Sequence, residues 1–229
     1  MLYILDTADL EAIKHANEYY PLAGVTTNPS IIAKANTDFW KLVEDIRGII
    51  GDFKMLHVQT TQTVAEKIVE EAELLKKRVG GSILGQYFFI KIPISEEGLK
   101  ATKILSEKGI GVTMTAIFTP TQALMAAKAG ASFVAPYVNR LDNIIGDGTD
   151  VVAEIVEQFD NYGLDCQVLA ASFKNAQQVN KCADVGCHTV TVNADILKML
   201  IEHPMTDKAI EGFNKDWSSV YGDKTILDF

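Results

Sequence analysis

The sequence has only three cysteines, Cys166, Cys182 and Cys187, and no two of them have CxxC spacing. An odd number without that spacing is typical of neither a disulfide scaffold nor a zinc site. We therefore expect reduced, mostly buried thiols in a cytoplasmic protein.

Clusters of positive charge and long apolar runs are also missing. The chain has 21 basic and 30 acidic residues, a formal net charge of −9, and no basic run longer than residues 76–78. No stretch approaches the roughly 18 apolar residues that a membrane span needs, and the N-terminus "MLYILDTADL" lacks a basic segment followed by a long apolar one. We expect neither nucleic acid nor membrane as a partner.

The motifs of several enzyme classes are absent as well. No GxGxxG, GxxxxGK[ST] or GxSxG occurs, which argues against nucleotide-binding loops and against a serine nucleophile on a strand-to-helix elbow. The four histidines lack HxH or HxxxH spacing. We expect no metal and no cofactor, and we interpret His57, two residues before a strand end, as a core histidine.

What the sequence does have is an alternation of short apolar runs with helical patterns. The apolar runs lie at 2–6, 23–28, 54–60, 87–93, 111–118, 131–138, 166–173 and 188–193. Eight β/α units in 229 residues, without a linker, predict a single (β/α)8 barrel over residues 1–229. An open, doubly wound sheet is the alternative, but it would normally have a glycine-rich loop after the first strand, where this chain has Asp6-Thr7-Ala8-Asp9.

The segment 204–229 follows the last of these units and is predicted to form a C-terminal helix and tail. It is rich in apolar and aromatic residues, among them Trp217, Tyr221, Leu227 and Phe229. Such a segment needs a surface to cover, either on its own barrel or on a neighbouring subunit.

Polar residues stand at or near the ends of seven of the eight predicted strands. In a barrel these ends form the active-site face. A single polar residue at a strand end can be a helix cap, as Asn28 before Pro29 can be, but seven strands in succession indicate a shared polar site. The residues are Asp6, Thr26, Thr27, Asn28, Gln59, Lys91, Thr113, Thr115, Tyr137, Asn139, Arg140 and Ser172.

Lys91 is the most unusual of these residues, because the surrounding run "YFFIKIPI" has the pattern of a strand buried on both faces. Its ammonium group either extends into solvent at the barrel mouth or is buried. Burial would lower the pKa of the amine from about 10.4 and make it a nucleophile that attacks a ketone to form an iminium. Proton transfer and hydrogen bonding to the substrate can be supplied by Tyr137, Gln59, Thr115, Asn28 and Asp6.

Four segments together resemble the transaldolase family, in its small single-barrel branch, and most closely the fructose-6-phosphate aldolases. They are "PLAGVTTNPSII" at 21–32, "IKIPIS" at 90–95, "TAIFTPTQALMAAKAGASFVAPYVNRLD" at 115–142 and "LAASFKN" at 169–175. The resemblance implies a (β/α)8 barrel with the Schiff-base lysine on the fourth strand, at Lys91. It also implies a homo-oligomer, a decamer, in which the C-terminal segment packs on a neighbouring subunit.

Within this family, transaldolases transfer dihydroxyacetone between sugar phosphates, whereas fructose-6-phosphate aldolases release it. Transaldolases typically have glutamate, asparagine and phenylalanine where this chain has Gln59, Thr113 and Tyr137. The resemblance to the aldolases implies that Tyr137 is the acid/base for a catalytic water held with Gln59 and Thr115. The expected reaction is the reversible cleavage of fructose 6-phosphate to dihydroxyacetone and glyceraldehyde 3-phosphate; transaldolase activity and a non-catalytic sugar-phosphate-binding barrel are the alternatives.

The resemblance also implies the substrate-binding residues. Asp6 and Asn28 would bind and polarise substrate hydroxyls, and Thr26 would support the same pocket. The small side chain of Ala135 would leave room beside the bound ketone. At the remaining positions, Arg140 and Ser172 would face the phosphate, and Thr113, where the aldolases are expected to have leucine, would affect the choice of acceptor.

Overall fold

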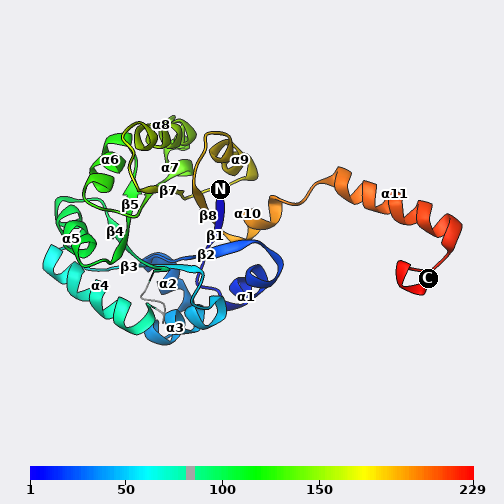
Figure 1. Ribbon diagram of the computed structural model, residues 1–229, viewed down its shortest axis with the longest axis horizontal. Coiled ribbons are helices and arrows are strands. Elements are labelled where there is room, and N and C mark those ends of the chain that lie inside the picture. The colour runs from blue at the N-terminus through cyan, green and yellow to red at the C-terminus, as the bar shows by residue number, and fades with distance from the viewer. Residues whose placement is uncertain (81–85) are drawn as a thin grey trace.

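The fold is a closed barrel of eight parallel strands, seen in a computed structural model that describes residues 1–80 and 86–229 (Figure 1). Each strand pairs with the next along the chain, and β1 pairs with β8. This confirms the predicted (β/α)8 barrel and shows that the open-sheet alternative is wrong. The strands are β1 (Leu2–Asp6), β2 (Leu22–Thr26), β3 (Met55–Gln59), β4 (Phe88–Pro93), β5 (Gly111–Ile117), β6 (Phe133–Pro136), β7 (Gln167–Ala170) and β8 (Thr189–Val192).

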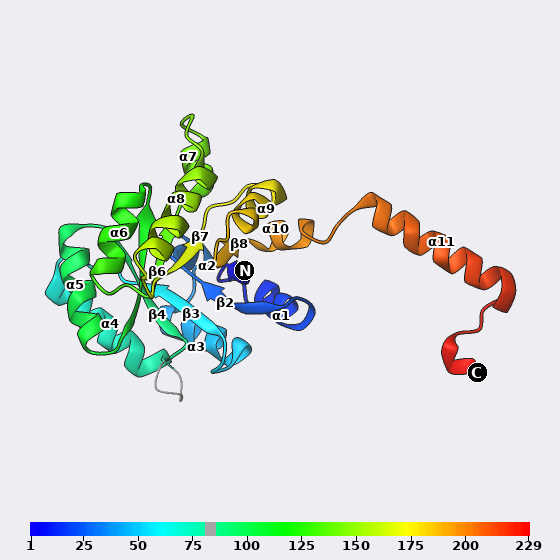
Figure 2. The ribbon, with the colours of Figure 1, turned by 45° about the horizontal axis from the view of Figure 1, so that its top comes forward.

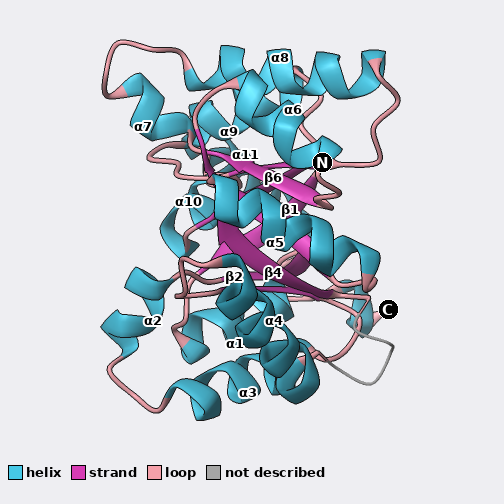
Figure 3. Cartoon of the chain, turned by 90° about the vertical axis from the view of Figure 1, so that its left-hand side faces the viewer, coloured by secondary structure: helices cyan, strands magenta, loops and turns pink. Residues whose placement is uncertain are grey.

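The helices before residue 200 surround the barrel (Figure 3). Most begin at a polar N-cap. For example, the Thr119 hydroxyl accepts from the Gln122 amide, and the Gln122 side chain accepts from the Thr119 amide in return, which satisfies donors that a helix start leaves free. The helices are α1 (Leu10–Tyr19), α2 (Pro29–Ala35), α3 (Phe39–Ile50), α4 (Ala65–Val79), α5 (Glu96–Glu107), α6 (Pro120–Lys128), α7 (Val138–Asp142), α8 (Gly148–Asn161), α9 (Ala176–Asp184), α10 (Ala194–Met199), α11 (Pro204–Tyr221) and the short 3-10 helix η1 (Ile226–Asp228). None of the helices among the described residues combines the length and apolarity needed to cross a membrane.

Apolar side chains fill two regions of the fold. The larger lies between the sheet and the helices, and the smaller, around Ile4, Met55, Phe133 and Leu169 with Phe89, lies inside the barrel. The three cysteines are free and buried, as predicted, and burial raises the pKa of the Cys166 thiol to about 12.

The C-terminal segment extends away from the barrel (Figures 1 and 2). Every residue from 201 to 229 is exposed, so this segment is not buried against the described part of its own barrel. Its aromatic residues instead contact one another: the Trp217 and Tyr221 rings lie 4.6 Å apart, and the Tyr221 and Phe229 rings 5.5 Å apart. Large apolar side chains nevertheless remain open to solvent, including Phe213 at 71% and Leu227 at 96% exposure.

Candidate active site

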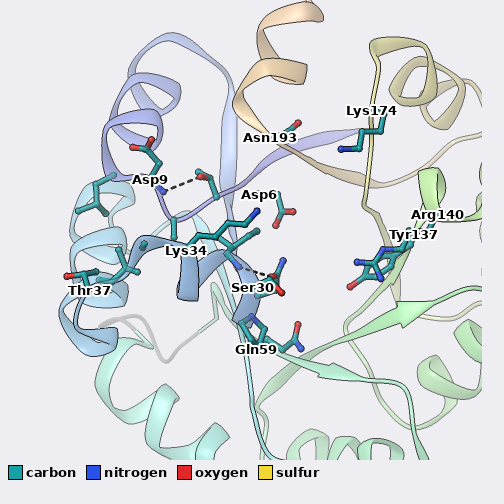
Figure 4. A pocket seen from close by; sticks show the side chains of 18 residues that line it. Asp6, Asp9, Ser30, Lys34, Thr37, Gln59, Tyr137, Arg140, Lys174 and Asn193 are labelled. Carbon is teal, nitrogen blue, oxygen red and sulfur yellow. Dashed lines mark hydrogen bonds between the residues drawn. The ribbon is translucent and has the colours of Figure 1, made fainter. Parts of the chain in front are cut away.

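A cavity of about 1010 Å³ opens at the carboxyl ends of the strands (Figure 4). This is the face on which (β/α)8 barrels place their active sites. Five of the residues singled out in the sequence line the cavity, namely Asp6, Asn28, Gln59, Tyr137 and Arg140. They come from the ends of β1, β2, β3 and β6 and from α7, so the barrel brings together residues that lie far apart in the sequence.

Lys91 lies on β4 beside this cavity. It pairs in register with Gln59 on β3 and with Thr113 on β5. Phe89, two residues earlier, stacks on the ring of His57 inside the barrel, and side chains two apart on a strand share a face, so Lys91 also points inward. Only 4% of Lys91 is exposed, so the lysine does not extend into solvent.

The burial of Lys91 changes its acid–base behaviour. Loss of solvation lowers the pKa of the amine below its ordinary value, while the negative charge of Asp6 acts in the opposite direction. Because desolvation is the larger effect, a greater fraction of the amine is neutral near pH 7 than in an exposed lysine. The neutral amine is the form that attacks a carbonyl carbon.

Asp6 is held by a chain of hydroxyl groups. The Thr26 Oγ1 donates to Asp6 Oδ1 at 2.7 Å and lies 2.6 Å from Thr191 Oγ1. Since the Thr26 hydroxyl has one proton and gives it to Asp6, Thr191 must be the donor to Thr26. Thr191 on β8 thus extends the contact between Thr26 and Asp6, and the role of Thr26 toward the substrate stays a prediction.

Asn28 serves both as a helix cap and as part of the cavity wall. Its side-chain oxygen accepts a hydrogen bond from the Ile31 amide at 3.0 Å, and Pro29 occupies the first turn of α2. The capping interpretation is thus correct, and it also fixes the side chain at the edge of the cavity.

Tyr137 and Thr115 contact each other through their hydroxyl groups. The phenol oxygen lies 3.1 Å from Thr115 Oγ1. The ring is held by an edge contact with Phe118, at 5.5 Å, and by the Arg140 guanidinium, 4.7 Å above the ring centre. The β5–β6 register shifts between Thr115 and Ile117, and Ala116 between them has a φ of 58°. This bulge redirects the strand just after Thr115, as bulges beside active sites commonly do.

Four predicted substrate-binding residues, Thr26, Thr113, Ala135 and Ser172, do not line the cavity. Thr113 is fully buried, and its hydroxyl bonds to His57 Nδ1 at 2.9 Å. Ala135 is 1% exposed and pairs in register with Thr115. Ser172 is half-buried after β7, in the left-handed region with a φ of 64°. Their roles toward substrate stay predictions.

The cavity wall also contains residues that the sequence did not single out, among them Ser30, Lys34, Lys174 and Asn193. Lys174 extends from the loop after β7 on the same side of the cavity as Arg140 and Tyr137 (Figure 4). It follows the strand end by four residues, so a search of the loops as well as the strand ends would have found it. Among the described residues, no group of three histidine, cysteine, aspartate or glutamate side chains is placed to hold a metal ion.

Comparisons with known proteins identify the family of the chain. The family model "Transaldolase/Fructose-6-phosphate aldolase" matches residues 3–224. A protein named probable transaldolase from Geobacillus sp. (strain WCH70) is 42% identical over 95% of this chain and 99% of its own length, and one from Clostridioides difficile (strain 630) is 41% identical over 95% and 97%. Thiamine phosphate pyrophosphorylase from Pyrococcus furiosus shares the fold alone, with a TM-score of 0.59 at 14% identity over 84% of this chain and 85% of that one. The chain thus belongs to the transaldolase/fructose-6-phosphate aldolase family, an enzyme family of carbohydrate metabolism.

Proposed function

We propose that this protein is a Schiff-base aldolase that reversibly cleaves fructose 6-phosphate to dihydroxyacetone and glyceraldehyde 3-phosphate. The observation that carries the proposal is the buried amine of Lys91, whose pKa is lowered by desolvation beside a polar cavity. Burial disfavours the charged form of an amine, and groups perturbed in this way cluster at functional sites.

The proposed reaction begins when the Lys91 nitrogen attacks the ketone carbon of the substrate. The carbinolamine loses water to give an iminium, which takes up the electron pair of the bond between its α and β carbons as that bond breaks and so becomes an enamine. The aldehyde forms when the hydroxyl on the β carbon of the substrate loses its proton, and Asp6, a carboxylate of the cavity wall, is the proposed acceptor. Protonation of the resulting enamine and addition of water then release dihydroxyacetone, so the water lost in the first step is returned.

Release of dihydroxyacetone requires a positioned water, and Tyr137 is the proposed acid/base for it. The contact of its phenol oxygen with Thr115 Oγ1 supports this role, because the two hydroxyls form a proton-transfer pair at the cavity edge. Gln59 lines the same cavity and is neutral, so it can orient the water but cannot deprotonate it. Arg140 and Lys174, on the same side of the cavity, are the proposed partners of the substrate phosphate.

Transaldolase activity is the second candidate, because the relatives described above are named probable transaldolases. Product formation from fructose 6-phosphate with and without erythrose 4-phosphate separates the two reactions. We expect glyceraldehyde 3-phosphate from fructose 6-phosphate alone. Turnover that appears only with the acceptor would make the protein a transaldolase.

Trapping tests the role of Lys91 and also the alternative of a non-catalytic barrel. Borohydride with dihydroxyacetone should add one reduced adduct, on Lys91, as located by digestion and mass spectrometry. An adduct on Lys54, Lys174 or another lysine would contradict the assignment of Lys91. A protein that acquires no adduct at all would be a binding barrel rather than a Schiff-base enzyme.

We further propose that the C-terminal segment packs on a neighbouring copy of the chain in a homo-oligomer, a decamer. The exposure of Phe213, Trp217 and Val220 along α11 supports this proposal, because a large exposed apolar patch marks a surface that another chain covers. Deletion of the residues after Lys215 should reduce the number of chains per particle, measured by size-exclusion chromatography with light scattering. An unchanged number would contradict the proposal that the segment packs on a neighbouring copy.

A cytoplasmic location is proposed as well, supported by the three free, buried thiols.

A further inference from the structure

A buried histidine and a threonine are joined across the inner face of β4. His57 Nδ1 on β3 lies 2.9 Å from Thr113 Oγ1 on β5, so the hydrogen bond spans the strand between them. In the sheet register His57 pairs with Phe89 and Thr113 pairs with Lys91. The His57 ring also stacks on Phe89 at 4.8 Å. The His57–Thr113 pair therefore lies inside the barrel between Phe89, toward the closed end, and Lys91, toward the cavity.

The surroundings of His57 keep its imidazole neutral. The ring is fully buried, and its Nε2 has no hydrogen-bond partner among the described residues. Burial, reinforced by the positive charges of Lys91 on β4 and Arg47 on α3, lowers the pKa of His57 well below its ordinary value. The other neighbouring strands offer uncharged groups to the ring, such as Thr113 on β5 and Phe133 on β6. Asp6 on β1 is the carboxylate that acts on Lys91 from across the site.

We propose that His57 and Thr113 are positioning residues for Lys91 and together form a neutral polar floor beneath its amine. The proposal rests on the Schiff-base function proposed above. The nitrogen of Lys91 must be uncharged when it attacks the ketone and must carry a positive charge as the iminium. A charged floor would oppose the iminium, and an apolar floor would leave the iminium without a dipole near it. A neutral imidazole, fixed in orientation by Thr113, is compatible with both states.

The sharpest test changes the hydrogen bond and leaves the shape of the barrel unchanged. Thr113→Val keeps the volume and removes the hydroxyl, and Thr113→Ser restores the hydroxyl. Thr189→Val is the matched control, because Thr189 is also fully buried in the barrel and its hydroxyl has no partner among the described residues. The readout is the rate at which cyanoborohydride traps the dihydroxyacetone adduct, followed by intact-protein mass from pH 5 to 10.

We expect Thr113→Val to slow trapping about tenfold at pH 7.5, the effect of leaving one buried partner unsatisfied. Thr113→Ser should stay within about twofold of wild type, and Thr189→Val should match wild type. His57→Phe, which makes the floor apolar, should move the alkaline rise of the trapping rate to lower pH, because the ammonium form becomes less favourable.

The outcomes separate this inference from the proposed function. If wild type forms no adduct, the Schiff-base function fails and the floor fails with it. If wild type forms the adduct while Thr113→Val and His57→Phe, both folded by circular dichroism, match it in rate and pH profile, only the floor is refuted.

A measurement that needs no Thr113 variant is the ¹⁵N chemical shift of the His57 imidazole, assigned by its loss in His57→Phe. The ring should be neutral at pH 7 before and after reduction of the adduct, and a charged imidazole would overturn the proposal.

Discussion

Replacing Tyr137 by phenylalanine should remove the proposed proton-transfer group without moving the ring that carries it. The edge contact with Phe118 and the stacking of Arg140 involve only the ring, so both survive the change. Within the described residues the hydroxyl makes one hydrogen bond, to Thr115 at 3.1 Å, and its loss costs about 0.5–1.5 kcal/mol of stability. A positioned acid/base contributes about 10²- to 10⁴-fold in rate, or about 2.7–5.4 kcal/mol at 1.36 kcal/mol per factor of ten. The activity should therefore fall much further than the stability.

The assay is glyceraldehyde 3-phosphate formation from fructose 6-phosphate, coupled to its dehydrogenase, with adduct trapping measured in parallel. Tyr137→Phe should lose about 10²-fold or more in cleavage while it still forms a trappable adduct on Lys91. Tyr162→Phe is the matched control, since Tyr162 is a surface tyrosine that also lies beneath a cation, with Lys128 Nζ 5.7 Å from its ring centre. A Tyr137→Phe enzyme within tenfold of wild type would show that the water is activated elsewhere.

Three further changes test other parts of the structure. Lys91→Met should abolish turnover and raise the free energy of unfolding at pH 7 by about 1 kcal/mol. The pKa of Lys91 is lower in the folded chain than in the unfolded one, so the stability of the wild type falls as the pH decreases from the unfolded-state pKa to the folded-state pKa. Urea unfolding at a series of pH values should show a weaker pH dependence in the variant. Gln59→Glu should increase transfer to erythrose 4-phosphate relative to release of dihydroxyacetone, and an unchanged ratio would remove Gln59 from the choice between reactions. Arg47→Lys should cost about 3 kcal/mol in urea unfolding, because the buried guanidinium donates to four separate carbonyl groups and one ammonium cannot reach them all. A loss below about 1 kcal/mol would show that these four hydrogen bonds contribute little to the stability of the fold.

The barrel could be predicted from the sequence because its signal is repeated. Each apolar run is short and each helical pattern has its own period, so an error in one unit does not change the count. The ends of the strands were less certain: the run at 131–138 predicted a strand that in fact ends at Pro136, where α7 soon begins. The position of Lys91 at the same level as Gln59 depends on register, which the pattern of single strands does not contain.

The C-terminal segment shows a second limit of the sequence. Its residues predicted a C-terminal helix, and the structure confirms the helix as α11, but composition does not say which surface covers its apolar side chains. The structure shows that the described part of its own barrel is not that surface, since Phe213 and Leu227 remain exposed. In the proposed oligomer that surface belongs to a neighbouring copy of the chain, so the sequence pattern of one chain does not identify it.

Two residues that the sequence predicted to be in the same site lie at different depths along the barrel axis. Thr113 and Thr115 lie two residues apart on β5 and both point inward, yet one contacts Tyr137 at the cavity edge and the other contacts His57 beneath Lys91. The alternation of a strand fixes the face of each residue but gives no measure of depth, which depends on how neighbouring strands are staggered. For the same reason His57 was correctly interpreted as a core histidine, while its position relative to the lysine could not be seen. In a barrel enzyme the core directly below the reacting amine is also part of its electrostatic environment, so a buried residue there acts on the chemistry without touching the substrate.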